Sequence, residues 1–375
     1  MPTLLLDSGN LVTEASWLGE LQYETAILAM NEMGYDALNI GEQDLFLPPD
    51  YLQETERKVS FRILATNIYA QVVGQLGRRS MMQTYQLGDI TLKIGITSIC
   101  SPKFATKVEQ VNPYIVFAKA LESLEPILKD LRKQVDLIIV LASVEPEEAE
   151  KLAEAFPIID ILIVAHGSFP PLDKPTKVGQ TIILNSNTAS KYLGRLDLTF
   201  DTTKKIIHQR HEMIPLTADI PSSTEVLQLL QRHDEKLDSQ DLLSIEAERT
   251  RFPGGGTFTG SQDCIECHQE AVDLWEKSAH ARAYAPIRQH KREYDISCLK
   301  CHTTGFGYIG GFRGNEQTPQ FAMVGCEGCH GAGSNHLMNN YQDYGEVTEA
   351  KCQSCHDAES SPQFNYETAL KTIQH

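Results

Sequence analysis

Eight of the nine cysteines in this 375-residue chain lie between positions 264 and 355, and they occur in pairs. Two residues separate the members of each pair, and a histidine follows the second cysteine. The four copies are Cys264-Ile-Glu-Cys267-His268, Cys298-Leu-Lys-Cys301-His302, Cys326-Glu-Gly-Cys329-His330 and Cys352-Gln-Ser-Cys355-His356. The ninth cysteine, Cys100, stands alone in the first 250 residues. Such a sharp change of composition indicates two units with different chemistry.

The C-x-x-C-H spacing is the signature of covalent haem attachment. The two thiols bond to the vinyl groups of one porphyrin, and the adjacent histidine becomes the proximal ligand of the iron. The sequence therefore predicts four haem c groups attached through the eight cysteines, with His268, His302, His330 and His356 as proximal ligands. These cofactors would also fill the interior of a segment whose apolar periodicity is weak.

Two other uses of paired cysteines stay open. Zinc ribbons use four thiolates for each zinc ion, so four pairs could hold two ions. Disulfides are common in small secreted domains. A zinc ribbon has no need of a histidine directly after each pair, and this favours haem.

A haem iron also has a sixth position, on the distal side. An iron with this position filled transfers electrons, whereas an open position allows a substrate to bind. Among the remaining histidines of this region, His280 and His336 are the first distal candidates, His290 is the next and His375 the last. The alternative for each is a surface histidine. At least one haem is left without a named sixth ligand.

The first 220 residues alternate short apolar runs with amphipathic helical patterns, which favours an α/β layered domain. Strands are expected at 4–6, 37–40, 62–65, 91–99, 136–142, 159–164 and within 181–214, and helices at 14–33, 112–132 and 146–156. A polar helix is expected at 223–250, before the breaker Phe252-Pro-Gly-Gly-Gly. We place the boundary near 245–258 and predict domains at 1–250 and 251–375, the second mainly α-helical and rich in loops.

Part of the second domain resembles the cytochrome c-554 family of tetrahaem cytochromes. The resemblance covers roughly residues 258–360 and rests on three runs: Cys298-Leu-Lys-Cys-His-Thr-Thr-Gly-Phe-Gly, Gly310-Gly-Phe and Val324-Gly-Cys-Glu-Gly-Cys-His-Gly-Ala-Gly-Ser-Asn-His336. It implies a mostly helical, haem-packed domain that relays electrons. Most irons of that family have two histidine ligands and one can be five-coordinate. His280 and His336 match the positions that supply distal ligands.

Residues 1–215 resemble the catalytic domain of the 5′-nucleotidase (UshA-like) metallophosphoesterases. The resemblance rests on the order and spacing of the runs at 5–10, 29–41, 65–67, 93–97, 136–141, 160–166 and 192–198. It implies a layered sandwich in which two divalent metals clamp a phosphate and activate a water.

The residues that the resemblance assigns to those metals differ in this chain. The family's opening Asp-x-His would lie before residue 1. The substitutions are Asn10 for the bridging aspartate, Glu42 for the metal-binding asparagine, Gln43 for the transition-state histidine, and Ser143 and Ser168 for two histidines. Only His166 is kept. We therefore expect no functional dinuclear metal site and no catalytic residue, and the alternative is a weak single-metal site with Glu42 and Asp44.

The composition also limits the partners and the compartment. A net charge of −17 argues against nucleic acid and anionic membranes, and no apolar run is long enough for a transmembrane segment. Covalent haem attachment in c-type cytochromes takes place outside the cytoplasm, so we expect a periplasmic or extracellular protein. Residues 1–7 do not form a signal peptide. We expect a signal peptide and the family's first strand to precede residue 1 in the native chain.

Together these features predict an exported multihaem c-type cytochrome that carries electrons between redox partners. The acidic surface favours a basic protein partner, although exposed charges are screened beyond about 8–10 Å. The alternatives are a metal-dependent phosphoesterase fused to a redox domain and an oxidoreductase that acts at an open haem iron. Self-association, including a filament of cytochrome units, also stays open.

Overall fold

The computed structural model describes residues 2–12, 15–166, 174–185, 191–217, 219–239, 250–290, 292–339, 344–357, 360–373 and 375. The chain forms two compact units, Met1–His233 and Asp234–His375. Of the boundary predicted at 245–258, residues 245–249 lie outside the described part of the chain. The boundary therefore stays a prediction.

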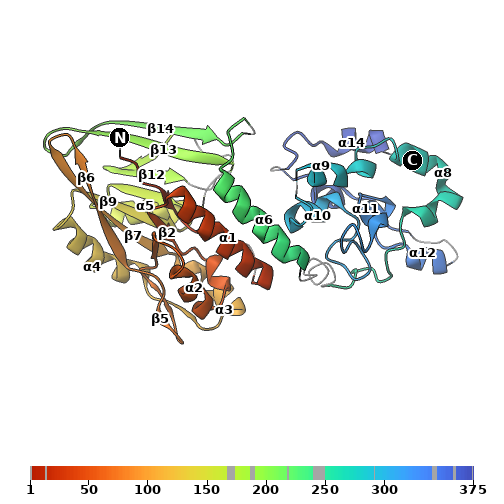
Figure 1. Ribbon diagram of the computed structural model, residues 1–375, viewed down its shortest axis with the longest axis horizontal. Helices are drawn as coiled ribbons and strands as arrows, with labels where there is room; N and C mark the ends of the chain where they lie inside the picture. Colours follow the sequence, from red (N-terminus) through yellow and green to blue (C-terminus); the bar gives the residue numbers. More distant parts are fainter. Residues whose placement is uncertain are drawn as a thin grey trace. The chain divides into compact units, whose positions relative to one another are not determined.

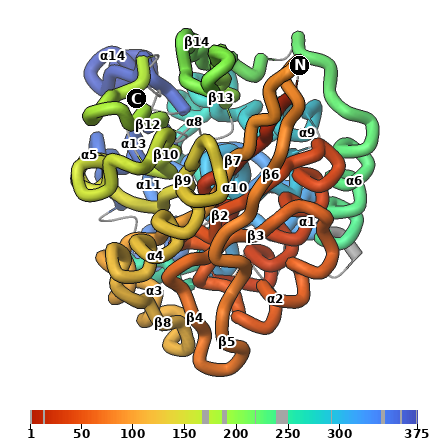
Figure 2. Tube along the Cα trace, turned by 90° about the vertical axis from the view of Figure 1, so that its left-hand side faces the viewer, coloured from red at the N-terminus to blue at the C-terminus, as the bar shows by residue number. Residues whose placement is uncertain are grey.

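The first unit is built on a six-stranded sheet with the strand order β11-β12-β10-β9-β7-β6 (Figures 1 and 2). Its strands are β6 (Ser80–Leu87), β7 (Ile90–Cys100), β9 (Leu137–Ser143), β10 (Ile161–Val164), β11 (Thr176–Val178) and β12 (Thr181–Asn185). The four central strands β7, β9, β10 and β12 are parallel, and β6 and β11 pair antiparallel at the edges.

A second, smaller sheet has three parallel strands, β1 (Leu6–Asp7), β2 (Ala37–Asn39) and β3 (Arg62–Leu64). A third sheet joins β4 (Ile68–Ala70), β5 (Gly74–Gln75) and β8 (Ile115–Phe117). The helical elements beside these sheets are α1 (Trp17–Met33), η1 (Asp44–Phe46), α2 (Pro49–Glu56), η2 (Pro102–Phe104) and α3 (Ala105–Val111).

Apolar side chains join these elements into layers. Leu124 and Leu128 of α4 (Ala120–Arg132), with Leu152 of α5 (Pro146–Ala155), pack against one face of the large sheet. On the other face, Leu64 of the small sheet lies in one apolar cluster with Ile96. A separate cluster joins α1 and α2 to the small sheet. Each fully buried aliphatic side chain of this kind contributes roughly 1.5–3 kcal/mol, so the layers are held by apolar burial.

A long hairpin and the first part of a helix, which continues into the second unit after His233, complete the first unit. The hairpin joins β13 (Tyr192–Phe200) to β14 (Ile206–Pro215), and its apolar residues pack on the large sheet. Helix α6 (Thr224–Ser239) runs beside α1, and the Oγ1 of Thr25 lies 2.9 Å from the Nδ1 of His233 (Figure 1). The side chain of Ser223 caps α6 by accepting a hydrogen bond from the N–H of Val226.

One expected helix begins later than its spacing indicates. The pattern at 112–132 predicts a single helix, but α4 begins at Ala120 and residues 115–117 form β8. β8 pairs with β4, where Ile115 lies opposite Ala70. Because β-branched side chains suit a strand and β4 supplies backbone partners, tertiary pairing overrides the helical spacing.

The second unit has short helices, as the sequence predicts. They are η3 (Ser261–Cys264), α8 (Ile265–Trp275), η4 (His280–Arg282), α9 (Tyr284–Gln289), α10 (Ile296–His302), η5 (Pro319–Phe321), α11 (Cys326–His330), α12 (Ser334–Met338), α13 (Glu349–Gln353) and α14 (Tyr366–Ile373). An aromatic cluster in which Phe258 contacts Phe252, Tyr308 and Phe321 forms part of the interior. Among the described helices of the whole chain, none is long and apolar enough to cross a membrane.

Candidate functional site

Each C-x-x-C-H motif lies in or beside a short helix. The first spans η3 and the start of α8, the second ends α10, the third is α11, and the fourth ends just after α13. Residues three apart lie on the same face of a helical turn. The two thiols of a motif can therefore face the same ring, and the histidine comes directly after them.

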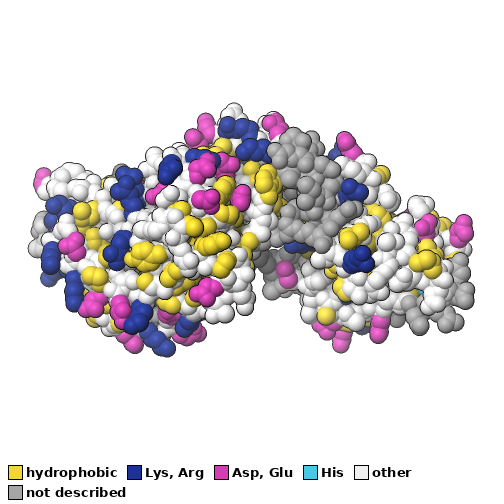
Figure 3. Space-filling model, turned by 90° about the horizontal axis from the view of Figure 1, so that it is seen from below, with side chains coloured by type: hydrophobic (Ala, Val, Ile, Leu, Met, Phe, Trp, Pro, Cys, Tyr) yellow, Lys and Arg dark blue, Asp and Glu magenta, His cyan; other side chains and the backbone are white. Residues whose placement is uncertain are grey.

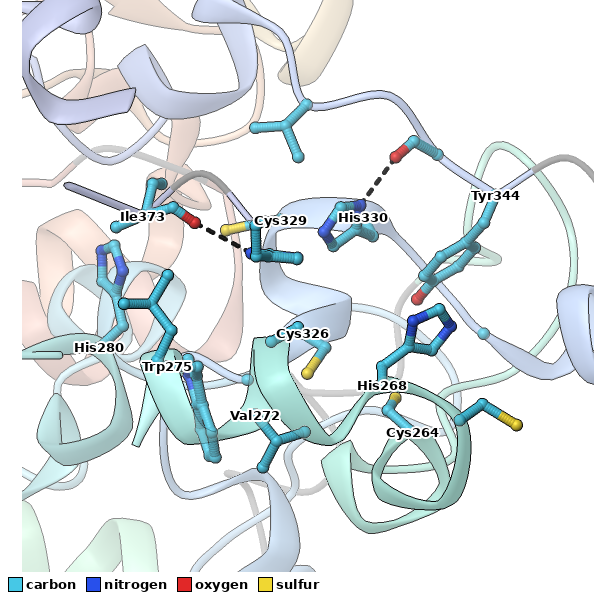
Figure 4. Close-up of a pocket in the computed structure, with 18 of the residues that line it drawn as sticks. Cys264, His268, Val272, Trp275, His280, Cys326, Cys329, His330, Tyr344 and Ile373 are labelled. Carbon is cyan, nitrogen blue, oxygen red and sulfur yellow. Dashed lines mark hydrogen bonds between the residues drawn. The ribbon is translucent and has the colours of Figure 1, made fainter. Parts of the chain in front are cut away.

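The first and third motifs line one cavity of about 1490 Å³ (Figure 4). The six motif residues in its wall are Cys264, Cys267, His268, Cys326, Cys329 and His330. Apolar side chains, among them Val272, Trp275 and Ile373, line the same space. The volume exceeds that of ordinary small-molecule sites, which have about 300–1,000 Å³. Thiols, imidazoles and apolar walls around so large a cavity fit a covalently attached porphyrin.

Three motif histidines face a second histidine. Two imidazoles that bind one metal from opposite sides, each with its nitrogen about 2 Å from the metal, have ring centroids about 6 Å apart. The observed centroid distances are 6.4 Å for His268 and His336, 6.0 Å for His356 and His280, and 5.9 Å for His330 and His375. The donor set therefore fits iron with two axial histidines at three motifs.

Hydrogen bonds orient three of the motif imidazoles. The Nδ1 of His302 lies 2.5 Å from the carbonyl oxygen of Ala283, and that of His330 lies 2.9 Å from the carbonyl oxygen of Gly345. The Nδ1 of His356 lies 3.0 Å from the Oγ of Ser361. An Nδ1–H that donates to a carbonyl leaves Nε2 with the lone pair that a metal needs. His302 and His330 are thus held as Nε2 ligands.

The two remaining distal candidates are His290 and His375, which the sequence ranks third and last. His290 is exposed directly after the last residue of α9. His375, the last candidate from the sequence, lies against His330. His302 has no second histidine ring in contact within the described residues. No sequence signal separates His375 from a surface histidine, because its position depends on how the end of the chain folds back.

The motifs also lie next to one another in pairs. The thiol of Cys264 lies near that of Cys326, and the interaction between them raises the pKa of Cys264 above its usual value. The thiol of Cys301 lies near that of Cys355, which raises the pKa of Cys301, and the Cys355 thiol lies 4.0 Å from the carbonyl oxygen of Lys300. The first motif therefore lies beside the third, and the second beside the fourth.

A second cluster lies in the first unit, at the carboxyl ends of its parallel strands. Asn10 follows β1, Glu42 follows β2, Ser143 ends β9 and His166 follows β10. The structure brings these four residues together, although they come from distant parts of the sequence. Ser168, the fifth substituted position, lies outside the described residues.

The carboxylate of Glu42 is the centre of this cluster. Its oxygens accept hydrogen bonds from Asn10 Nδ2 at 3.0 Å each and from Ser143 Oγ at 2.5 Å. His166 Nε2 lies 3.2 Å from the oxygen that accepts from Ser143. Burial raises the pKa of Glu42, but the bonds from His166, Ser143 and Asn10 outweigh it and hold the pKa below its usual value. The bond to Glu42 raises the pKa of His166.

The neighbouring acid, Asp44, holds the backbone of two loops together. Its buried carboxylate accepts hydrogen bonds from the backbone N–H groups of Asn10, Leu11 and Gly41, at 2.7–2.9 Å. Burial raises its pKa to about 7, against the effect of these bonds. Gln43 donates its backbone N–H to Asn10 Oδ1. Within the described ranges, no group of three or more His, Cys, Asp and Glu side chains could hold a metal ion.

Comparisons with known proteins confirm the resemblance of the second part of the chain. Residues 263–331 match the family model described as "Cytochrome c554 and c-prime". Cytochrome c-554 from Nitrosomonas europaea is 31% identical over 107 residues, which are 24% of this chain and 45% of that protein.

The resemblance of the first part is also confirmed. Protein 5NUC of Lutzomyia longipalpis and the 5′-nucleotidase of Vibrio vulnificus are each 22% identical, over 70% and 71% of this chain and 49% and 55% of their own length. The chain thus spans about half the length of the curated relatives it matches.

Solved structures confirm the predicted α/β metallophosphoesterase-like fold of the first part. Sulfate thiohydrolase SoxB of Thermus thermophilus has a TM-score of 0.54 at 20% identity, over 73% of this chain and 49% of that one. The calcineurin-like phosphoesterase YfkN of Bacillus subtilis has a TM-score of 0.53 at 20% identity, over 62% of this chain and 83% of that one. At this identity the likeness shows the fold alone.

Proposed function

We propose that the chain is an exported multihaem c-type cytochrome that carries electrons between redox partners through four covalently attached haems. The observation that carries this proposal is the position of a second imidazole about 6 Å from three motif histidines, His268, His330 and His356. Two axial histidines leave no open site for a substrate, which suits electron transfer.

The residues of the chain have distinct tasks in this proposal. The eight paired cysteines attach the porphyrins, and the motif histidines bind from the proximal side. His336, His280 and His375 supply the distal imidazoles for the first, fourth and third motifs, and His290 is not assigned. When bound, the haems would supply one-electron chemistry. The backbone N–H of Cys326 donates to Ser261 Oγ, and Cys355 lies beside Lys300, so neighbouring attachment sites are close.

The partners in this proposal are redox proteins outside the cytoplasm. A net charge of −17 favours a basic partner. Acidic and basic side chains intermingle on the face shown in Figure 3. The electrostatic attraction between that face and a basic partner is therefore distributed over the face and not confined to one patch.

For the first unit we propose a scaffold or binding role without hydrolysis of nucleotides. Two metals about 3.5–4 Å apart need bridging charge. At the bridging position the neutral Asn10 donates hydrogen bonds to Glu42. Ser143 and His166 hydrogen-bond the same carboxylate. Asp44 is held by backbone N–H groups. Both buried carboxylates, Glu42 and Asp44, are thus satisfied by hydrogen bonds within the protein, and the cluster offers little to a cation.

A second candidate function is chemistry at the haem of the second motif. His302 is oriented by Ala283 but has no second histidine ring near it in the described residues. An iron bound there would have an open position, and this favours binding of a small ligand. Binding of one carbon monoxide per reduced chain would support this candidate, and no binding would count against it.

Haem stoichiometry and reductive titration test the main proposal. The full chain is produced in a host that attaches haem c, and its haem content is measured by mass spectrometry and by the pyridine haemochrome spectrum. We expect four haems and the uptake of four electrons. The double variant Cys352→Ala/Cys355→Ala should hold three. Fewer than four haems in the unaltered chain, or an unaltered count in the double variant, would contradict the proposal.

A further inference from the structure

Glu327 is a buried carboxylate inside the loop of the third motif. It follows Cys326 directly, and its exposed fraction is 2%. Its Oε1 accepts from the N–H groups of Thr259 at 2.9 Å and Gly333 at 2.7 Å, and its Oε2 accepts from Gly260 at 2.8 Å. The side chain thus joins the segment before the first motif to the turn after the third.

These partners suit the ionised form of Glu327. An ionised carboxylate only accepts hydrogen bonds, whereas a protonated one must donate its own proton. The three N–H groups can only donate. No lysine or arginine forms an ion pair with Glu327 within the described residues. The structure therefore contains a buried negative charge whose partners are backbone dipoles.

This charge lies between the first and third attachment sites. A Cβ atom added at Gly333 would meet Glu327 Oε1 at 3.1 Å and the Tyr344 hydroxyl at 3.4 Å. Tyr344 stacks on both His330 and His336, with ring centroids 5.4 and 4.9 Å apart. Burial raises the pKa of Tyr344, and the charge of Glu327 adds to the rise. The carboxylate therefore lies close to axial histidines assigned to both sites.

A fixed negative charge affects one-electron reduction in a definite direction. Reduction adds one electron, supplied by the redox partner, and removes one positive charge from the iron. A nearby anion favours the more positive ferric state, and burial strengthens the effect because the local dielectric is low and salt screens it little. Charge and burial are established determinants of haem potentials in general.

The other two motifs have an uncharged residue at the position of Glu327, Leu299 and Gln353, and each has a basic residue nearby. Lys300 lies inside the loop of the second motif, and Lys351 directly precedes the fourth. Both are exposed, so their effect is smaller, but its direction is opposite.

We propose that Glu327 is a positioning residue that lowers the reduction potentials of the haems at the first and third motifs, so that these are the two lowest of the four. This inference rests on the proposed function. An electron at either of these haems then has a driving force to leave toward the second and fourth.

The test is a spectroelectrochemical titration of the four-haem protein with Glu327→Gln, which removes the charge and nearly keeps the shape. We expect the reduction equilibrium constant of at least one haem to rise tenfold or more, which is about 59 mV for a one-electron couple. The matched control is Glu266→Gln, which removes a carboxylate inside the first motif that is exposed. Because Glu266 is exposed and screened by solvent, the control should shift the potentials by much less than Glu327→Gln does.

The haem count tests the proposed function, and the reduction potentials test the role of Glu327. A chain without four haems would contradict the proposed function, whereas four haems in Glu327→Gln with unshifted potentials would overturn the role of Glu327. If this variant does not hold four haems, the unaltered protein decides by nuclear magnetic resonance titration with each haem assigned. The two lowest potentials at the first and third motifs would support the inference, and any other order would overturn it.

Discussion

Asn10 donates its side-chain amide to both carboxylate oxygens of Glu42, at 3.0 Å each. The two residues come from the ends of neighbouring parallel strands, β1 and β2. Asn10 has a positive φ of 70°, a conformation that asparagine adopts more readily than most residues. In this arrangement a neutral amide stands where the resemblance implies a bridging aspartate, and it donates to a carboxylate where the resemblance implies an asparagine.

Replacing this amide by a second acid should destabilise the first unit. Asn10→Asp keeps the size and tolerates the positive φ, but it places two carboxylates in contact and removes a donor from buried Glu42. We expect a loss of about 1–3 kcal/mol at pH 7. Urea unfolding followed by tryptophan fluorescence measures it in a Trp275→Phe background, where Trp17 is the remaining tryptophan. Asn10→Gly, which removes the donor without adding charge, is the control and should lose less.

The unaltered chain should not hydrolyse 5′-nucleotides when manganese is supplied. Glu42 is already satisfied by Asn10, Ser143 and His166, so a cation would have to displace these donors. Release of phosphate from adenosine monophosphate by the haem-loaded protein is the measurement. Metal-dependent turnover that Glu42→Gln abolishes would show that this cluster is an active site after all.

The pair of Glu42 and His166 should make the stability of the first unit depend on pH. The pKa of Glu42 is held below its usual 4.5, so its contribution is present above pH 4.5 and is lost as the pH falls through the lowered value. The pKa of His166 is raised above 6.5, so its contribution is complete below pH 6.5 and is lost as the pH rises through the raised value.

Urea unfolding between pH 5 and 9 checks this dependence. The stability of the unaltered chain should decrease as the pH rises through the raised pKa of His166. His166→Gln keeps a donor without a titrating group, so its stability should change less over the same range. Parallel profiles for the two proteins would refute the role of this ion pair.

The layered fold of the first unit could be read from the sequence because its signals are local. The helix at 146–156 has a proline at its first turn, and α5 spans Pro146–Ala155. The helix at 14–33 ends at Gly34, which has a left-handed conformation. β4 and β5 were not expected, since they have three and two residues and form only through pairing with distant segments.

In the candidate sites, too, the sequence predicts the features that depend on local spacing and not those that depend on distant contacts. The spacing of C-x-x-C-H is local. The resemblance to the metallophosphoesterases indicates which substituted positions correspond to metal ligands in that family. The bonds of Glu42 to Ser143 and His166 depend on side-chain conformations across two sheets, and no sequence pattern indicates them. Glu327 lies inside a motif, but only the fold shows that it is buried beneath Thr259 and Gly333.

Removing a distal histidine should open one iron and leave the others unchanged. His336 lies 6.4 Å from His268 between ring centroids, so His336→Ala should convert one low-spin haem to high spin and add one carbon monoxide per reduced chain. Electron paramagnetic resonance and gas titration measure both. The matched control is His290→Ala, because His290 is exposed after α9 and should be silent. A spin change in the control, or none in His336→Ala, would mean that the distal ligands are assigned to the wrong histidines.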